Sequence, residues 1–278
     1  MSKALYLPGA NRTDRWFLDN YPAQFTFDRL EKLLWHSTET PKTSGCPGYS
    51  SGAVAPQVTI NPWPGHQKTW QHFPLNRAGR ALSNPTSTPV SENKDYVLQV
   101  EVIGYSDPGY GRQYGCYLPE LPQEGIDYLA EFAAFVTREW GVADTLPPTW
   151  PLYKVSSWAA MDAAHMTSSA YDAHRGWLAH LHAPSPSTHG DAALPIAKIR
   201  DKKRALLAPA PPPTTGEPVA TVPNYVGTTA ATDVVKALMR SDVFPNPDRE
   251  TEPENPYITG YQWLQKINKR TAPQPPTA

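Results

Sequence analysis

Residues 122–141 read PQEGIDYLAEFAAFVTREWG, and this stretch does most to define the class of fold. Its apolar residues recur every three or four positions, which places them on one side of a helix and predicts burial of that side. Gly141 comes directly after the last apolar residue and is a typical helix stop signal. The apolar positions are Ile126, Leu129, Ala133, Val136 and Trp140. We therefore expect an amphipathic helix that covers a core built from other elements.

The segments before this helix have the composition of β-strands. They are rich in β-branched and aromatic residues, and clusters of Gly, Pro, Asn and Ser separate one segment from the next. The expected strands are residues 3–7, 31–39, 56–62, 68–74 and 95–106. Strands combined with helices predict an α/β domain with a central mixed β-sheet flanked by helices.

Two further helices are expected later in the chain. One spans about 167–179, begins at a Thr-Ser-Ser cluster suited to capping, and delivers His180 at its C-terminal end. The other spans 192–208, with Pro195 suited to its first turn. With these helices the main domain is expected to cover residues 1–208.

The rest of the chain changes composition. Residues 209–222 are rich in proline, which removes backbone donors and favours extended structure, so we expect a linker there. Residues 223–278 hold two short helical patterns and predict a small, mostly helical extension that is marginal for a core of its own. The two patterns are TAATDVVKALMRS and TGYQWLQKINKR.

The composition argues against several classes of function. Lys and Arg number 25 against 26 Asp and Glu, so the net charge of −1 does not favour nucleic acid or an anionic membrane as a partner. The 2 cysteines are too few for a disulfide scaffold or a cysteine zinc cluster. No apolar run approaches the roughly 18 residues of a membrane span, and residues 1–16 lack the apolar segment of a signal peptide. We therefore expect a protein without membrane insertion, made in the cytoplasm.

Three histidines and an aspartate gather in residues 177–195, WLAHLHAPSPSTHGDAALP, although the whole chain has only 8 histidines. Hydrolytic zinc sites use three protein ligands, commonly imidazole and carboxylate, and leave a fourth position open. His180 and Asp191 are joined by a Pro- and Ser-rich loop that can bring both to one point. His36 ends the apolar run LLW where a strand gives way to a polar loop, so its ring can project into a cleft.

Three segments carry a resemblance to a known family. They are WHSTET around His36, LQVEVIG around Glu101, and AHLHAPSPSTHGDA, which contains His180 and Asp191. In order and separation they resemble the zinc-dependent N-acetylmuramoyl-L-alanine amidases of the amidase-2 type, especially endolysins of phages that infect actinobacteria. The resemblance covers roughly residues 1–204. It implies a Zn²⁺ ion held by the two histidines and the aspartate.

The resemblance also implies a mechanism. Zinc would acidify a water molecule and polarise the amide that joins muramic acid to L-alanine. Glu101 would take the proton of that water and return one to the leaving amine, and His189 would donate a hydrogen bond to the oxyanion. Without the resemblance, Glu101 also fits an ion-paired strand residue, and His189 also fits a solvent-facing or supporting histidine.

The sequence departs from the family pattern in two places. Ala179 stands where the family has glycine before the second histidine, and the Asp-Pro-Gly turn of the family reads Asp191-Ala192-Ala193. Loss of the Pro-Gly turn leaves His182 as an alternative third ligand. A literal Cys-Pro-Gly occurs at 46–48, but it follows the first histidine, so we give it no role.

The resulting expectation is a peptidoglycan hydrolase: an endolysin that reaches the cell wall from the host cytoplasm after holin-type release, or a lysin carried in the virion. Residues 223–278 would then bind the wall or dock to a phage tail. Two alternatives stay open. One is a peptidoglycan-recognition module that has lost turnover, and the other is a structural tail protein with an amidase-like domain.

Overall fold

The computed structural model describes residues 3–18, 25–82, 91–150, 163–184 and 191–208, and the backbone of 244–245 and 257–258. The chain divides into two compact units, Met1–Pro209 and Ala210–Ala278. In the second unit, β6 (Phe244–Pro245) pairs antiparallel with β7 (Tyr257–Ile258). The expected linker and both expected helices of this unit lie outside the described residues.

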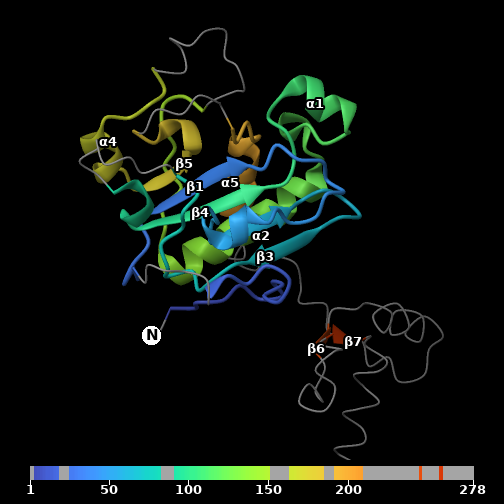
Figure 1. Cartoon of the computed structure of the whole chain (residues 1–278), viewed down its shortest axis with the longest axis horizontal. Coiled ribbons are helices and arrows are strands. Elements are labelled where there is room, and N and C mark those ends of the chain that lie inside the picture. Colours follow the sequence, from blue (N-terminus) through green and yellow to red (C-terminus); the bar gives the residue numbers. More distant parts are fainter. Residues whose placement is uncertain are drawn as a thin grey trace, which may run out of the picture. The chain divides into compact units, whose positions relative to one another are not determined.

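The first unit is built around a five-stranded sheet of order β3-β2-β4-β1-β5 (Figure 1). Neighbouring strands are parallel except for β3, which pairs antiparallel with β2 at one edge. The strands are β1 (Lys32–Ser37), β2 (Val58–Asn61), β3 (Lys68–Gln71), β4 (Val97–Val102) and β5 (Gly176–Ala179). This mixed sheet with its helices confirms the expected α/β class.

The helices in the described part of the first unit are α1 (Pro108–Gln113), α2 (Gln123–Trp140), α4 (Ser168–Ala173) and α5 (Ile196–Leu207). Short 3₁₀ turns cover Tyr49–Gly52, Glu92–Lys94, Leu118–Glu120 and His180–His182. Within the described residues, none of the helices combines the length and apolar character needed to cross a membrane.

Helix α2 covers one face of the sheet together with α5 (Figure 1). Its apolar side is buried as expected, and the helix ends at Gly141, whose φ of 75° is the left-handed conformation that glycine adopts most readily. The rings of Trp35 in β1 and Phe132 in α2 meet edge to face at 5.9 Å. Residues at alternate strand positions therefore point toward α2 and form the main core.

The intervening strand positions point to the opposite face of the sheet. Leu34 of β1 packs there with Tyr171 of α4 and Leu178 of β5 in a smaller apolar cluster. Because side chains alternate along a strand, His36 and Glu101 share this face, away from α2. The sheet thus separates the structural core from the face that carries the candidate site.

Two of the expected elements are wrong. Residues 3–7 form no strand, although Leu5 accepts a hydrogen bond from the backbone N–H of Leu75. The helix expected over 167–179 is capped by Thr167 but stops at Ala173, and the chain then enters β5. Gly176 has a φ of 149°, and a Cβ there would collide with the carbonyl of Thr145, which favours glycine at this bend into the strand.

Candidate metal site

One row of the sheet carries the candidate site residues. His36 in β1 pairs with Glu101 in β4, and Glu101 pairs in turn with Thr59 in β2. On the other side of β1, Trp35 pairs with Ala179, the last residue of β5, so His180 follows directly beside His36. The parallel strands therefore bring these side chains together near their carboxyl ends, where α/β sheets usually bind their ligands.

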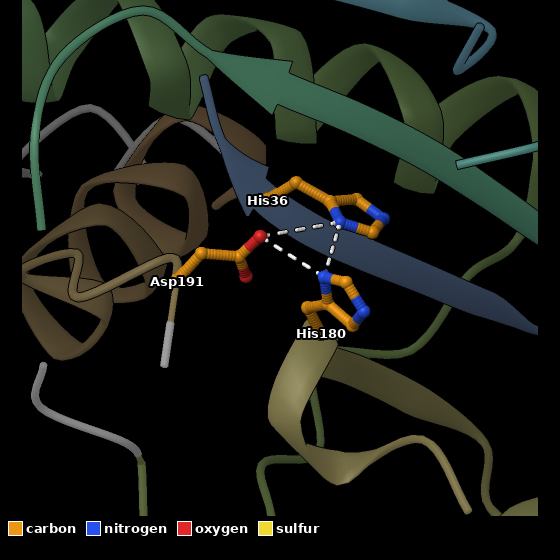
Figure 2. Close-up of side chains that lie close together, drawn as sticks. All are labelled: His36, His180 and Asp191. Carbon is orange, nitrogen blue, oxygen red and sulfur yellow. Dashed lines mark hydrogen bonds and ion pairs between the residues drawn. The ribbon is translucent and has the colours of Figure 1, made fainter. Parts of the chain in front are cut away.

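Two histidines and an aspartate point toward one another at this end of the sheet (Figure 2). The Nδ1 atoms of His36 and His180 lie 3.2 Å apart, and Asp191 Oδ2 lies 3.0 Å from His180 Nδ1 and 3.6 Å from His36 Nδ1. The side chains of His36, His180 and Asp191 are only 1%, 13% and 5% exposed. These three residues are 144 and 11 positions apart in the sequence, so the fold itself creates the cluster.

The spacing of these three atoms fits a divalent transition-metal ion. Zinc bonds to nitrogen and carboxylate oxygen measure about 2.0–2.2 Å, so two ligand atoms of a tetrahedral site lie roughly 3.3–3.5 Å apart. The observed separations of 3.0, 3.2 and 3.6 Å bracket that value. Imidazole and carboxylate also suit several other first-row metals. The group can therefore hold a metal ion, but the donor set does not define which metal.

Charge pairing dominates the ionisation of Asp191. Burial opposes ionisation of this carboxyl, but the charge of His180 and hydrogen bonds from both histidines outweigh it, and the pKa of Asp191 falls well below its usual value. Burial lowers the pKa of His180, and the neighbouring Asp191 more than compensates, so that the pKa is raised overall. Asp191 is thus an anionic group that favours a cation beside it.

Glu101 lies next to His36 on the same face and lines the same pocket. Burial raises the pKa of Glu101 well above its usual value, and the negative charges of Asp191 and Glu39 raise it further. Its Oε2 atom is buried and has no hydrogen-bond partner among the described residues. Glu101 is therefore a carboxyl group poised to accept a proton or a hydrogen bond in the pocket.

The backbone after Asp191 is held by two serine hydroxyls. The N–H of Ala192 donates to Ser37 Oγ at 2.9 Å, and the N–H of Ala193 donates to Ser106 Oγ at 3.0 Å. Ala192 has a φ of 62°, the left-handed conformation that favours glycine. These hydrogen bonds hold the backbone that directly follows Asp191.

The two serines are connected to each other and to Glu39. Ser37 donates to Glu39 Oε1 at 2.7 Å, so its 2.8 Å contact with Ser106 Oγ requires Ser106 to donate. The backbone N–H of Ser106 donates to the same carboxylate oxygen at 2.8 Å. We call Ser37, Ser106 and Glu39 the serine clamp. Burial raises the pKa of Glu39, while its donors from Ser106, Ser37 and Asp107 act in the opposite direction.

A cavity of about 450 Å³ opens over the cluster. Its lining is rich in side chains that can accept hydrogen bonds. The lining residues are His36, Ser37, Thr38, Glu39, Thr40, Pro47, Tyr49, Val54, Ala81, Glu101, His180 and Asp191. The pocket is therefore wide enough for a small ligand beside a metal ion.

His182 lies outside the group of three candidate ligands. His182, the alternative third ligand, accepts from the N–H of Ala179 through Nδ1 at 2.8 Å, and its Nε2 lies 2.9 Å from the carbonyl of Thr149. Both of its ring nitrogens are therefore occupied by backbone, and Asp191 takes the third place in the group. His189 lies outside the described residues. His180 follows a strand, so its expected position at a helix end is wrong.

Several residues of the site were not singled out by the sequence. Ser37 and Glu39 lie within the HSTET segment itself, and Tyr49 follows the Cys-Pro-Gly triplet directly. Cys46 faces the ring of His72, with Sγ 4.0 Å from Nε2, and does not belong to the metal group. Pro47 nevertheless lines the cavity. The loop that holds this triplet therefore contributes a wall of the pocket rather than a ligand.

The sequence matches no protein-family model and no curated protein. The fold and the site define the class as an α/β protein with a buried group of two histidines and one aspartate that can hold a metal ion.

Proposed function

We propose that this protein is a zinc-dependent hydrolase of peptidoglycan that cleaves the amide bond between N-acetylmuramic acid and L-alanine. The observation that carries the proposal is the arrangement of two imidazoles and one carboxylate at metal-ligand spacing, beside Glu101 in an open cavity. The similarity of three sequence segments to amidase-2 enzymes suggests the bond and the polymer. Acting as a phage endolysin or virion-associated lysin follows from the same similarity.

The ligands His36, His180 and Asp191 would hold the ion with one side open to the cavity. A bound zinc ion supplies Lewis-acid polarisation of a carbonyl and acidifies a water molecule. The serine clamp keeps Asp191 oriented, and burial of the cluster excludes bulk water from the ligands. The part left to the protein is therefore positioning and proton transfer.

Proton transfer falls to Glu101 in this proposal. Its carboxylate would accept the proton released as water attacks the amide carbon, and would return a proton to the departing amine nitrogen. A raised pKa suits both halves of this task, because the group can hold the proton between the two steps. As pH falls, the rate should decrease when Glu101 becomes protonated, since the protonated carboxyl cannot act as the base.

The test combines metal analysis with mass spectrometry of digested peptidoglycan. We expect about one zinc ion per chain and release of stem peptides with a free L-alanine amine. His36→Ala should lose both zinc and activity. Glu101→Gln should keep zinc within about twofold and lose roughly 10²–10⁴ of the rate, because a general base is removed while the ligands stay.

The control variant is His66→Ala, because His66 is an exposed histidine outside the pocket. It should retain both zinc and activity. Zinc binding without any release of amine would contradict the hydrolase and would favour a recognition module. Cleavage at another bond would contradict the assigned substrate bond.

A further inference from the structure

A chain of hydrogen bonds leads from the pocket wall into the protein. The hydroxyl of Tyr49 lies 2.7 Å from Thr59 Oγ1, and Thr59 Oγ1 lies 2.8 Å from His72 Nε2. The other ring nitrogen of His72, Nδ1, lies 2.7 Å from the carbonyl oxygen of Arg15. Tyr49 lines the cavity of the metal cluster, whereas His72 is completely buried.

The carbonyl oxygen of Arg15, at the buried end of this series of hydrogen bonds, determines the direction of each one. A carbonyl oxygen can only accept, so His72 must donate from Nδ1 to Arg15. Burial lowers the pKa of His72 to about 4, so at neutral pH its Nε2 carries no proton and accepts a hydrogen bond. Thr59 Oγ1 is the donor, because it lies 2.8 Å from Nε2 whereas the Cys46 thiol, the other possible donor, lies 4.0 Å away. Thr59 has then spent its only proton, and Tyr49 must donate to it.

The phenol of Tyr49 consequently cannot offer its proton to a ligand while this chain is intact. Burial raises the pKa of Tyr49 well above its usual value, and the charge of Glu101 raises it further, so the group stays neutral. With its proton donated to Thr59, the Tyr49 oxygen can only accept further hydrogen bonds. An adjacent ligand would therefore meet a hydrogen-bond acceptor at this wall.

The position of the Tyr49 hydroxyl follows from its hydrogen bond to Thr59, which lies in the same row of the sheet as His36 and Glu101. Thr59 pairs with Glu101, and Glu101 pairs with His36, so the tyrosine's anchor lies two strands from the metal ligand. Strands are spaced about 4.8 Å apart, which separates the Thr59 and His36 backbones by about 10 Å. Tyr49 and Glu101 line the same pocket, so a ligand that reached from the metal group toward Tyr49 would extend beyond the reacting amide.

We infer that Tyr49 is a substrate-binding residue held by Thr59 and His72 as an obligate hydrogen-bond acceptor, and that it selects a ligand with an N–H or O–H donor beside the scissile amide. The assignment rests on the proposed function. Muropeptides carry such donors as amide N–H groups and as sugar hydroxyls. Tyr49 is thus distinct from a group that stabilises an oxyanion, which would have to donate.

The first measurement concerns the chain of hydrogen bonds and needs neither metal nor substrate. Nitrogen NMR of the His72 ring at pH 7 should report a proton on Nδ1 and none on Nε2. Thr59→Val should shift the Nε2 resonance, because its donor is removed, whereas Thr59→Ser should leave it near the wild-type position. A proton on Nε2 in the wild-type protein would overturn the inference.

The second measurement concerns the ligand and uses muramyl dipeptide, N-acetylmuramoyl-L-alanyl-D-isoglutamine, with the zinc-loaded protein. Tyr49→Phe keeps the ring and removes only the acceptor, so KM should rise about tenfold with kcat changed less than about threefold. Thr59→Val should raise KM by a smaller factor, and Thr59→Ser should restore it. Analogues of muramyl dipeptide that lack the N-acetyl N–H or one sugar hydroxyl should identify the donor. For the analogue that lacks the group bound by Tyr49, Tyr49→Phe should leave KM unchanged.

The outcomes separate this inference from the proposed function. An unchanged KM in Tyr49→Phe, or a large loss of kcat at constant KM, would overturn the acceptor role while leaving the hydrolase intact. No cleavage of either muramyl dipeptide or peptidoglycan by the zinc-loaded wild-type protein would overturn the proposed function and the ligand assignment together.

Discussion

Ala192 occupies a backbone conformation that favours glycine, directly after the candidate ligand Asp191. A left-handed φ costs a residue with a Cβ about 1–2 kcal/mol, so it persists only where neighbouring contacts enforce it. Here Ser37 and Ser106 accept the two backbone N–H groups that follow Asp191. Two serine hydroxyls therefore hold the strained backbone next to Asp191 in place.

The serine clamp leads to a prediction about metal affinity. Ser106→Ala removes the acceptor for the N–H of Ala193 and the donor to Ser37, so Asp191 should lose part of its orientation. We expect zinc to bind about 10- to 100-fold more weakly, as measured by competition with a chelator. Ser44→Ala, at an exposed loop position, is the matched control. Equal affinity in Ser106→Ala and the wild-type protein would contradict the role of the clamp.

Helix α5 is tied to the segment after α2 by a charged group. Asp144 accepts from Lys203 Nζ at 2.9 Å and from Arg204 Nε at 2.7 Å, and the Lys203 side chain is only 5% exposed. The hydrogen bond from Arg204 is the largest influence that holds the pKa of Asp144 below its usual value, and Lys203 adds to it. The ionised form of Asp144 therefore stabilises the packing of α5.

This arrangement predicts a pH-dependent loss of stability in Asp144→Asn. The folded pKa lies below the unfolded value of 3.8, so the contribution is complete above that value and disappears as pH falls through the folded pKa. We expect the free energy of unfolding to fall by roughly 1–3 kcal/mol at pH 7, and by less at pH 3. Urea denaturation at both pH values measures the difference. Asp201→Asn, on the exposed side of α5, should change stability by less than about 0.5 kcal/mol.

Most elements of the first unit were predicted from the sequence, but β5 was not. The 18 residues of α2 provide several turns of amphipathic periodicity, and β1, β2, β3 and β4 lie inside the expected segments. Strand β5 is as short as β2 and equally buried, but only two residues separate it from the end of α4, so the helical pattern extends over it. This extension of the helical pattern explains why His180 was placed on a helix.

The candidate site could be predicted only in part, for a related reason. His36, His180 and Asp191 are residue types with a recognisable chemistry, and the resemblance to amidases suggested their grouping. The serine clamp and Tyr49 act through hydrogen bonds whose partners are 69 to 155 positions away or depend on one loop conformation. Such pairings follow from sheet register, which a single sequence does not encode in any local pattern.

At the scale of the whole molecule, the first unit contains the main core and every described residue of the site. We predict that a fragment of residues 1–209 folds alone and hydrolyses soluble muropeptides within about twofold of the full chain. Thermal unfolding and mass spectrometry check the two parts. Slower action on intact walls alone would assign wall binding to residues 223–278. A fragment that does not fold, or that loses tenfold or more of its rate on soluble substrate, would contradict this division of labour.

The alignment of His180, His36, Glu101 and Thr59 along one row makes the site sensitive to insertions within strands. Adding one residue inside β1 before His36 would move every later side chain of the strand to the opposite face of the sheet. The imidazole of His36 would then point toward α2. An insertion in a connecting loop leaves the row unchanged. Insertions inside β1 or β4 should therefore abolish the site, whereas insertions in loops that carry no site residue should leave the row intact.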